Sequence, residues 1–248
     1  MSLTIHGITA SRAIRPLWVA AELGLTFEHV PTPYQGGATR TPAFLALNPN
    51  GHIPVVIDHR PEGEVVVWES MACALYLARH HGVADGASLT PATPREDAEA
   101  LRWSLWTVNE VEKDALTVLM HRLAMPPDQR KPDLADVAER RLYVPLRVLE
   151  QHLAAQQAHG EAHIAAERFT VADLCVASVL NWARPARELM AAHPRVNAWL
   201  GACMERPAYR ALRGERARTD AWRLPKCLSV DFEENLAKTQ RQMVNNCY

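Results

Sequence analysis

A proline at the mouth of an apolar strand constrains the fold of this chain more than any other single feature. Residues 48–56 read NPNGHIPVV, in which a turn-forming run leads into an apolar segment and Pro54 stands at its start. Proline has no N–H to give a sheet, so it is accepted at the first residue of a strand, at an edge or at a bulge. The sequence therefore predicts that Pro54 occupies one of these three positions.

The bulk composition is that of an ordinary globular protein. The 248 residues can bury a substantial core in one or two domains, and a formal charge of -1 with 48% hydrophobic residues suggests no special partner. The densest basic stretch, residues 210–218, lies among acidic neighbours, so we expect no nucleic-acid partner. No apolar run reaches the ~18 residues of a membrane span, and the first residues lack a signal-peptide pattern. We expect a cytoplasmic protein without membrane association.

The cysteines and histidines do not form an obvious reactive site. The five cysteines are widely spaced and contain no CxxC pair, which predicts free thiols in a reducing compartment: Cys73, Cys175, Cys203, Cys227 and Cys247. We expect them to be buried or incidental rather than catalytic. His159 and His163 have the spacing of two metal ligands on a helix, but no third ligand is near, so we expect no metal site.

The first 82 residues alternate between strand-like and helix-like patterns. We predict short strands over 3–7, 27–30, 53–57 and 65–68, and helices over 13–24, 42–47 and 70–81. This order fits a small mixed sheet covered by helices. The proline-containing, small-residue stretch 83–94 predicts a domain boundary.

Beyond this boundary the strand patterns disappear. We predict a long helix over 95–122, a second helix bent by Pro145, and a third that begins at Thr170 with Asp173 completing a capping box. Residues 95–222 are therefore expected to form an all-α domain. Residues 223–248 are polar and weakly patterned, and could be either a docked arm or a frayed tail.

These features together resemble the cytosolic glutathione transferases over residues 3–215. NPNGHIPVV looks like the family's N-P-x-G-[KRQ]-[VI]-P segment, WESMACALYLARHHG looks like its [ED]-S-x-A-I-x-x-Y-L element, and FTVADLCVASVL matches its helical capping box. The resemblance implies a thioredoxin-like α/β domain over 1–82 followed by an all-α helical bundle. It also implies glutathione as co-substrate and a homodimer.

The resemblance assigns glutathione-binding roles to particular residues. In that family the counterpart of Pro54 is cis, which offers the N–H and C=O of Ile53 to the cysteinyl unit of glutathione like an added strand. Ser70 would hold the γ-glutamyl carboxylate at a helix N-terminus and Glu69 the ammonium. His52 stands where many relatives carry Lys, Arg or Gln for the glycyl carboxylate. The alternatives are a trans proline that blocks an edge, a Ser70 that only caps its helix, and a solvent-exposed His52.

The chemical step requires the glutathione thiolate. A thiol with a pKa near 8.5 is only slightly ionised at pH 7, and lowering that pKa by about two units requires ~2.7 kcal/mol. A hydroxyl and the N-terminus of the first helix could supply it. Ser11 falls near the family's serine-type catalytic position, Thr9 is the second candidate, and Arg15 lies one turn further on as a glutathione-binding residue; either hydroxyl could instead merely cap the helix.

Two hypotheses about function follow. The first is a serine-type, bacterial or theta/zeta-like glutathione transferase that adds glutathione to a small hydrophobic electrophile, or uses it to isomerise or reduce one. Its substrate pocket would lie between the domains, with Trp106 as a candidate lining residue. The alternative is a non-catalytic, glutathione-transferase-like binding or interaction module.

Overall fold

The expected thioredoxin-like domain is confirmed. The computed structural model describes residues 2–83 and 88–219, with side chains through residue 214. Its first part contains β1 (Ser2–His6), α1 (Ile14–Glu22), β2 (Glu28–Val30), η1 (Ala38–Arg40), α2 (Pro42–Leu47), β3 (Val55–Arg60), β4 (Gly63–Trp68) and α3 (Ser70–His81). Pro54 lies immediately before β3, as a residue without an N–H requires.

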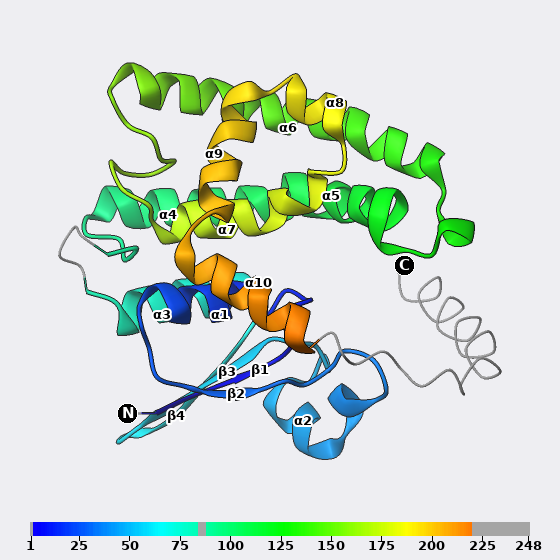
Figure 1. Ribbon diagram of the computed structural model, residues 1–248. Coiled ribbons are helices and arrows are strands. Elements are labelled where there is room, and N and C mark those ends of the chain that lie inside the picture. Colours follow the sequence, from blue (N-terminus) through cyan, green and yellow to red (C-terminus); the bar gives the residue numbers. More distant parts are fainter. Residues whose placement is uncertain (1, 84–87, 220–248) are drawn as a thin grey trace. The chain divides into compact units, whose positions relative to one another are not determined.

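The sheet has the strand order β2-β1-β3-β4. β1 runs parallel to β2 and antiparallel to β3, and β3 is antiparallel to β4. Successive side chains of a strand point to opposite faces, so Leu3 and Ile5 of β1 belong to the main core while Thr4 and His6 face the other way. Helices α1 and α3 lie on the first face and α2 on the second (Figure 1).

The α2 face is covered by a much smaller apolar cluster. Phe44 of α2 packs with Val55 and Ile57 of β3, and Leu47 and Ile53 lie against them. Thr41 caps α2, because its hydroxyl accepts the Phe44 N–H at 3.3 Å. This small helix therefore covers the β3 side of the face.

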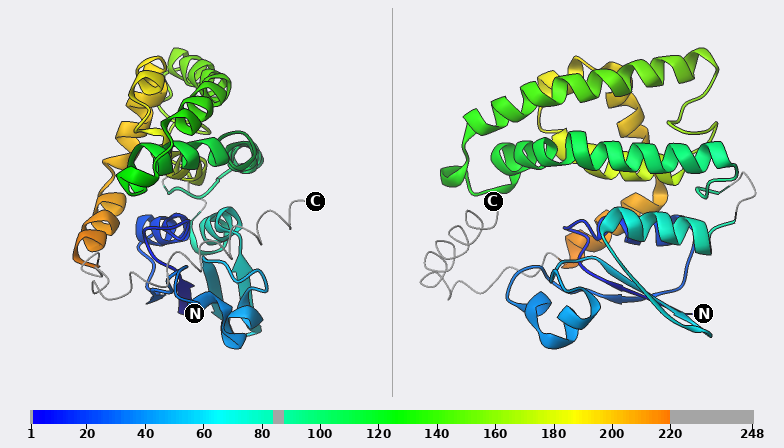
Figure 2. Two further views of the ribbon diagram at one scale, coloured as in Figure 1. Left: turned by 90° about the vertical axis from the view of Figure 1, so that its right-hand side faces the viewer. Right: turned by 180° about the vertical axis from the view of Figure 1, so that it is seen from behind.

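The second part is helical, as expected. It contains α4 (Pro94–Trp106), η2 (Thr107–Val111), α5 (Glu112–Leu119), η3 (Met120–Ala124), η4 (Pro127–Gln129), α6 (Pro132–Ala158), α7 (Val171–Leu180), η5 (Asn181–Ala183), α8 (Arg187–Ala191), α9 (Pro194–Met204) and α10 (Pro207–Thr219). Figure 2 shows α6 running alongside the α4–α5 segment. The predicted tail, residues 223–248, lies outside the described residues.

The predicted 95–122 helix is not a uniform α-helix. Residues 107–111 and 120–124 have π-helical hydrogen bonding, so α4 and α5 are separated by a π turn. A π turn inserts extra residues and rotates the side chains that follow it. Leu101, Leu105 and Val108 are exposed, whereas Val111 and Ala115, at and after the end of the π turn, are buried.

Helix α7 is the centre of the helical core, since each of its ten residues is buried. The predicted capping box is present: the Thr170 N–H donates to Asp173 Oδ2 at 2.9 Å. Asp173 Oδ1 also accepts the Ile164 N–H and the Trp199 indole N–H, both at 3.0 Å. The carboxylate therefore joins α7, the preceding loop and α9.

Three of the cysteines are buried free thiols. Cys73, Cys175 and Cys203 are free and buried, and burial raises the pKa of Cys73 to about 12 and that of Cys175 to about 11. A thiol nucleophile requires the thiolate, so neither is suited to attack an electrophile near pH 7. Cys227 and Cys247 lie outside the described residues.

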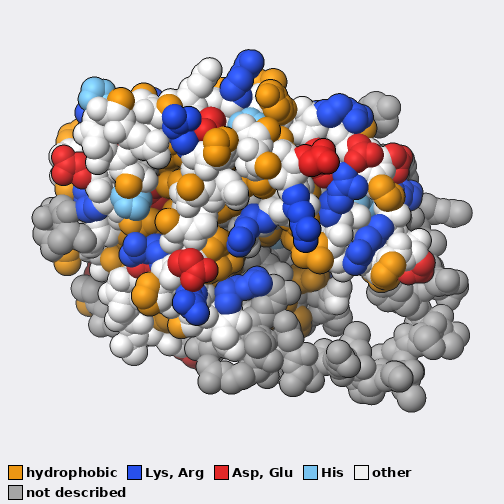
Figure 3. All heavy atoms as spheres, turned by 45° about the horizontal axis from the view of Figure 1, so that its top comes forward, with side chains coloured by type: hydrophobic (Ala, Val, Ile, Leu, Met, Phe, Trp, Pro, Cys, Tyr) orange, Lys and Arg blue, Asp and Glu red, His pale blue; other side chains and the backbone are white. Residues whose placement is uncertain are grey.

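Charged side chains of both signs are mixed on the surface. Over the helices seen in Figure 3, Lys and Arg are interspersed with Asp, Glu and hydrophobic side chains. Within residues 2–83 and 88–219, no helix combines the length and apolar character needed to cross a bilayer.

Candidate functional site

Gly7 brings the first loop, which connects β1 to α1, close to the segment that contains Ile53 and Pro54. It follows β1 with φ +133°, and a Cβ placed there would lie 2.5 Å from the Ala13 Cβ and 3.4 Å from the Ile53 Cβ. Only a residue without a side chain allows Ala13 and Ile53 to lie this close to position 7. The loop that carries Ser11 and Thr9 is thereby packed against the segment that carries Ile53.

The Ile53–Pro54 peptide bond is cis, as expected. Ile53 lies between a partly buried loop and β3, and no hydrogen bond involves its backbone N–H or C=O within the described chain. The preceding turn is fixed by Asn48, whose side-chain amide donates to the His52 carbonyl at 2.8 Å. His52 itself is exposed. The segment therefore offers one free donor and one free acceptor on its backbone.

Arg40 adds a cation to this segment that the sequence reasoning missed. Its guanidinium donates to the Asn50 carbonyl at 3.2 Å and lies so close to Gly51 that a Cβ there would be 2.7 Å from Nη1. Arg40 is therefore held next to the turn that presents His52. Its place in the polar loop before α2 is the only sequence signal that could have identified it.

Ser11 lies in the turn that opens into α1. Its hydroxyl donates to the Ile8 carbonyl at 2.7 Å and accepts the Ala13 N–H at 3.1 Å. Ser11 thus organises the turn while remaining partly exposed. Thr9 is also partly exposed, and its side chain makes no hydrogen bond to any described residue.

Glu69 and Ser70 form the junction between β4 and α3. Glu69 is exposed and has φ 69°, the one positive φ among the described non-glycine residues. Non-glycine residues in such sparsely populated conformations cluster at ligand-binding sites. Ser70 is the first residue of α3, and only 5% of its surface is exposed.

Arg15 lies in a buried network, with 1% of its surface exposed. Its guanidinium donates to Ser70 Oγ at 2.6 Å, to Glu112 Oε2 at 3.0 Å and to Ser178 Oγ at 3.1 Å. Burial lowers the pKa of Arg15, and the Glu112 carboxylate opposes that shift. Arg15 therefore contacts Ser70, and any effect it has on a ligand passes through that hydroxyl.

Arg12 of the first loop and a tryptophan of η5 lie beside this network. Arg12 forms an ion pair with Glu112, and its guanidinium carbon is 5.4 Å from the centre of the Trp182 ring. Arg15 lies 5.5 Å from the same ring. Trp182 and Glu112 were not predicted, because they are far from the first loop in sequence and no local motif marks them.

Trp106 belongs to the edge of the helical core. Its ring meets that of Trp103 edge-on, with the two centres 5.0 Å apart, and it packs against the buried cluster. The structure joins Arg15 to Ser70 by a hydrogen bond and brings Gly7, in the loop that carries Ser11, close to Ile53, but shows no such link to Trp106. Among the described residues, no group of three or more metal-binding side chains was found.

Two family models match this chain. The model described as glutathione S-transferase, N-terminal domain, matches residues 1–79. The model described as glutathione S-transferase, C-terminal domain, matches residues 113–207. The matched ranges contain the sheet with α1, α2 and most of α3, and the core helices α6, α7 and α9.

Individual proteins agree with these matches. Glutathione S-transferase 3 of Zea mays is 35% identical over 218 residues, covering 84% of this chain and 91% of that protein. Glutathione S-transferase GstB of Escherichia coli K12 is 26% identical over 209 residues, covering 84% and 96%. "Probable elongation factor 1-gamma 2" of Arabidopsis thaliana is 24% identical over 89% of this chain, but this chain spans 51% of that protein.

Solved structures show the same fold. The apo form of glutathione S-transferase III superposes with a TM-score of 0.70 and 31% identity, covering 86% of this chain and 96% of that one. Glutathione transferase URE2P6 of Phanerochaete chrysosporium, in complex with oxidised glutathione, gives a TM-score of 0.70 and 26% identity, covering 87% and 96%. From its domain matches and its 35% identity to the maize protein, this chain belongs to the glutathione S-transferase family.

Proposed function

We propose that this protein is a serine-type glutathione transferase that binds glutathione along Ile53 and adds its sulfur to a small electrophile. The observation that carries the proposal is the hydrogen bond from Arg15 to Ser70. An arginine can only donate, so Ser70 Oγ accepts and its own proton is left for another acceptor. Within the described chain, Ser70 Oγ donates no hydrogen bond of its own.

An anion is the natural partner for this hydroxyl. Ser70 is also the first residue of α3, where backbone N–H groups and the helix dipole favour a negative charge. The γ-glutamyl carboxylate of glutathione would receive both donors, and the exposed Glu69 carboxylate would meet the neighbouring ammonium. Arg15 serves this site indirectly, by fixing the direction of the Ser70 hydroxyl.

The other end of glutathione would lie against the 50–54 turn. The free N–H and C=O of Ile53 fit the cysteinyl backbone as an added strand. Because the chemistry of a carboxylate calls for a cation, we assign the glycyl carboxylate to His52 together with Arg40, which is always charged.

Ser11 is the proposed thiol-activating residue. Its hydroxyl now donates to the Ile8 carbonyl, and turning toward the sulfur would exchange a neutral hydrogen bond for a charge-assisted one, which is roughly twice as strong. Thr9, which lacks a partner in the described chain, is the second candidate. With a hydroxyl in this role, the protein would be a serine-type, bacterial or theta/zeta-like transferase.

The electrophile would approach from the side of Arg12 and Trp182. Arg12 follows Ser11 directly in sequence, and together with Trp182 it supplies a half-exposed cation and an aromatic surface. Trp106 stays a second candidate lining residue. Conjugation is the proposed reaction, with isomerisation or reduction by glutathione as variants of the same thiolate chemistry.

The organisation of the protein completes the proposal. We assign residues 1–82 to a glutathione-binding domain and 95–222 to a helical domain, in a cytoplasmic homodimer. The buried free thiols Cys73, Cys175 and Cys203 fit a reducing compartment. The exposed apolar side chains of α4 and β4 suit a partner chain.

The ultraviolet absorbance of bound glutathione thiolate, followed against pH, tests the proposal. We expect the bound thiol to have a pKa about two units below its free value. Ser11→Ala should return this pKa most of the way to its free value, while Thr9→Val should leave it lowered. The reverse pattern would assign thiol activation to Thr9. A bound thiol with an unshifted pKa in the unaltered protein contradicts a transferase mechanism.

The same measurement distinguishes the second candidate function. The match to an elongation factor 1-gamma favours a glutathione-transferase-like module that binds without turnover. Such a module would bind glutathione with an unshifted thiol pKa, or not bind it at all.

A further inference from the structure

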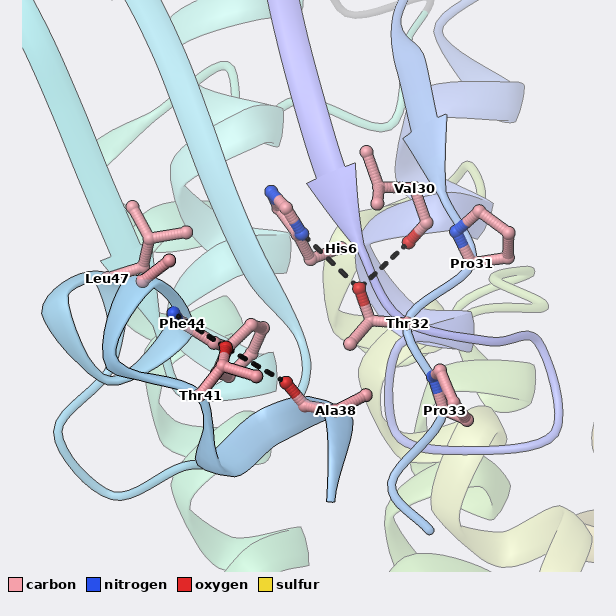
Figure 4. A pocket seen from close by; sticks show the side chains of 10 residues that line it. His6, Val30, Pro31, Thr32, Pro33, Ala38, Thr41, Phe44 and Leu47 are labelled. Carbon is pink, nitrogen blue, oxygen red and sulfur yellow. Dashed lines mark hydrogen bonds between the residues drawn. The ribbon is translucent and has the colours of Figure 1, made fainter. Parts of the chain in front are cut away.

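We propose that this protein has a second small-molecule site, a groove beneath α2 that binds an uncharged aromatic alcohol. The groove has a volume of about 390 Å³, within the range of ligand pockets. It lies between the ends of β1 and β2 and the residues that lead into and form α2. Figure 4 shows His6 and Val30 on one side of it and Phe44 and Leu47 on the other.

The groove exists because α2 is too short to cover the whole face of the sheet. The apolar cluster under α2 contains Val55 and Ile57 of β3, and it does not extend to β1 or β2. His6 and Val30, which continue the same face, border open space instead. The groove is therefore formed by the part of the sheet face that α2 leaves uncovered.

The groove is distinct from the proposed glutathione site. Its lining residues come from positions 6, 30–33, 38, 41, 43–44 and 47. None of the residues assigned above to glutathione lines it. A ligand in the groove would therefore occupy separate contacts, and both sites could be filled in one molecule.

The lining selects an uncharged ligand. No Lys, Arg, Asp or Glu side chain lines the groove. Burial lowers the pKa of His6, and the Glu28 carboxylate only partly opposes this shift, so the imidazole is neutral at pH 7. A charged ligand would lose hydration here without gaining a counterion.

The hydrogen bonds of His6 define what the ligand must offer. Thr32 Oγ1 donates to the Val30 carbonyl at 3.4 Å, so toward His6 Nδ1, 3.3 Å away, it acts as the acceptor (Figure 4). Nδ1 then carries the proton and Nε2 of the neutral ring is a bare acceptor. Nε2 has no partner within the described chain and is not among its buried unsatisfied atoms, so it is open to a ligand.

The walls favour a flat ring. The His6 and Phe44 rings meet edge-on with centres 6.0 Å apart, and Pro31 and Pro33, which follow β2, also line the groove. Such a corner offers contacts to the face and the edge of an aromatic ring. One O–H donor on a flat apolar body satisfies both the single acceptor and the apolar walls, which points to phenols and naphthols.

Binding of 2-naphthol, compared with 2-methoxynaphthalene, tests this site. Both would be titrated calorimetrically into the full-length protein with S-methylglutathione at saturation, so that the glutathione site is occupied. The methyl ether keeps the ring and removes the donor. Because a buried donor–acceptor pair is at stake, we expect 2-naphthol to bind about tenfold more tightly.

Two variants assign the binding to the groove. His6→Phe keeps a ring but removes the acceptor, and should reduce the naphthol preference to within about twofold. Ala43→Trp, at an exposed position on the rim, should fill the groove and weaken both ligands at least about tenfold. In carbon–proton correlation spectra, the His6 imidazole resonances should move on addition of 2-naphthol.

Two results would overturn the proposal. One is naphthol binding to Ala43→Trp as tightly as to the unaltered protein, which would place the ligand elsewhere. The other is a His6 imidazole resonance that does not move at saturating 2-naphthol. Either result leaves the glutathione transferase proposal unaffected, because neither readout depends on glutathione turnover.

Discussion

Gly7 stands where the loop that carries Ser11 packs against Ile53, and its lack of a side chain makes that contact possible. Gly7→Ala would place a Cβ 2.5 Å from the Ala13 Cβ, in a backbone conformation with φ +133°. We expect a loss of roughly 2–4 kcal/mol in unfolding free energy together with weaker glutathione binding, measured by urea denaturation and calorimetry. Gly24→Ala is the control: φ is +63° there but nothing lies within 4 Å, so the expected loss is about 1 kcal/mol. Equal losses in the two variants would contradict the packing role.

Asp58 makes acid stability depend on one buried carboxylate. Its Oδ2 accepts from Tyr76 and Arg60 at 2.7 Å and lies 2.8 Å from His81 Nε2. Burial raises the pKa of Asp58, but these hydrogen bonds outweigh burial and lower it below 3.8. A lowered folded-state pKa gives stability that is complete above the unfolded pKa and is lost as pH falls through the folded one.

Replacement of Asp58 should therefore make the free energy of unfolding depend less on pH under acid conditions. We expect Asp58→Asn to lose about 2 kcal/mol at pH 7 and to change less than the unaltered protein between pH 5 and pH 3. Urea unfolding across this range measures both effects. The control, Asp97→Asn, removes an exposed ion pair with Arg79 and should change neither the stability at pH 7 nor its pH dependence. If Asp58→Asn loses stability between pH 5 and pH 3 as steeply as the unaltered protein, another group controls the acid dependence.

At the scale of elements, the N-terminus of α7 depends on Asp173 because this end of the helix is buried. Besides the Thr170 N–H, the carboxylate satisfies the buried Ile164 N–H and Trp199 indole N–H. Asp173→Ala should cost roughly 4 kcal/mol in chemical denaturation, since several buried donors lose their acceptor at once. Thr93→Ala at the N-cap of α4, where the exposed Glu96 N–H can turn to water, should cost about 1 kcal/mol. Similar costs would show that Asp173 acts as a local cap only.

The sequence predicted elements that are specified locally. The strand start at Pro54, the α3 start at Ser70 and the α7 cap all depend on residues within a few positions of one another. It did not predict the π turn at Thr107–Val111, since the spacing of Leu101, Leu105 and Val108 is compatible with an uninterrupted helix. Glu112, Ser178 and Trp182 were missed for a related reason: each meets the first loop from about 100 to 170 positions away. Long-range partners leave no periodic trace in a single sequence.

At the scale of the whole molecule, Glu112 joins the sheet part to the helical part. It is the buried counterion of Arg15, while Arg15 also binds Ser70 of α3 and Ser178 of α7. Glu112→Gln leaves a buried cation without its charge partner, and we expect a loss of about 3 kcal/mol in unfolding free energy. Because Ser70 would be less firmly oriented, glutathione affinity should fall as well. Glu110→Gln, an exposed neighbour, should change neither the urea midpoint nor the titration with glutathione; a normal glutathione affinity in Glu112→Gln would exclude the orienting role.

The exposed stripe of α4 provides the last test, of the proposed homodimer. Leu105 is 62% exposed and lies in line with Leu101 and Val108, and Val66 and Trp68 are exposed on β4. A row of exposed apolar side chains at helical spacing is typical of an interface, whereas isolated apolar side chains are common on monomers. Leu105→Glu would bury an unpaired charge in that interface, so we expect light scattering to change from the mass of two 27.7 kDa chains to that of one. Val144→Glu, equally apolar and exposed on α6, should remain a dimer; dissociation by Val144→Glu alone would move the interface to α6 and leave the α4 stripe without a partner.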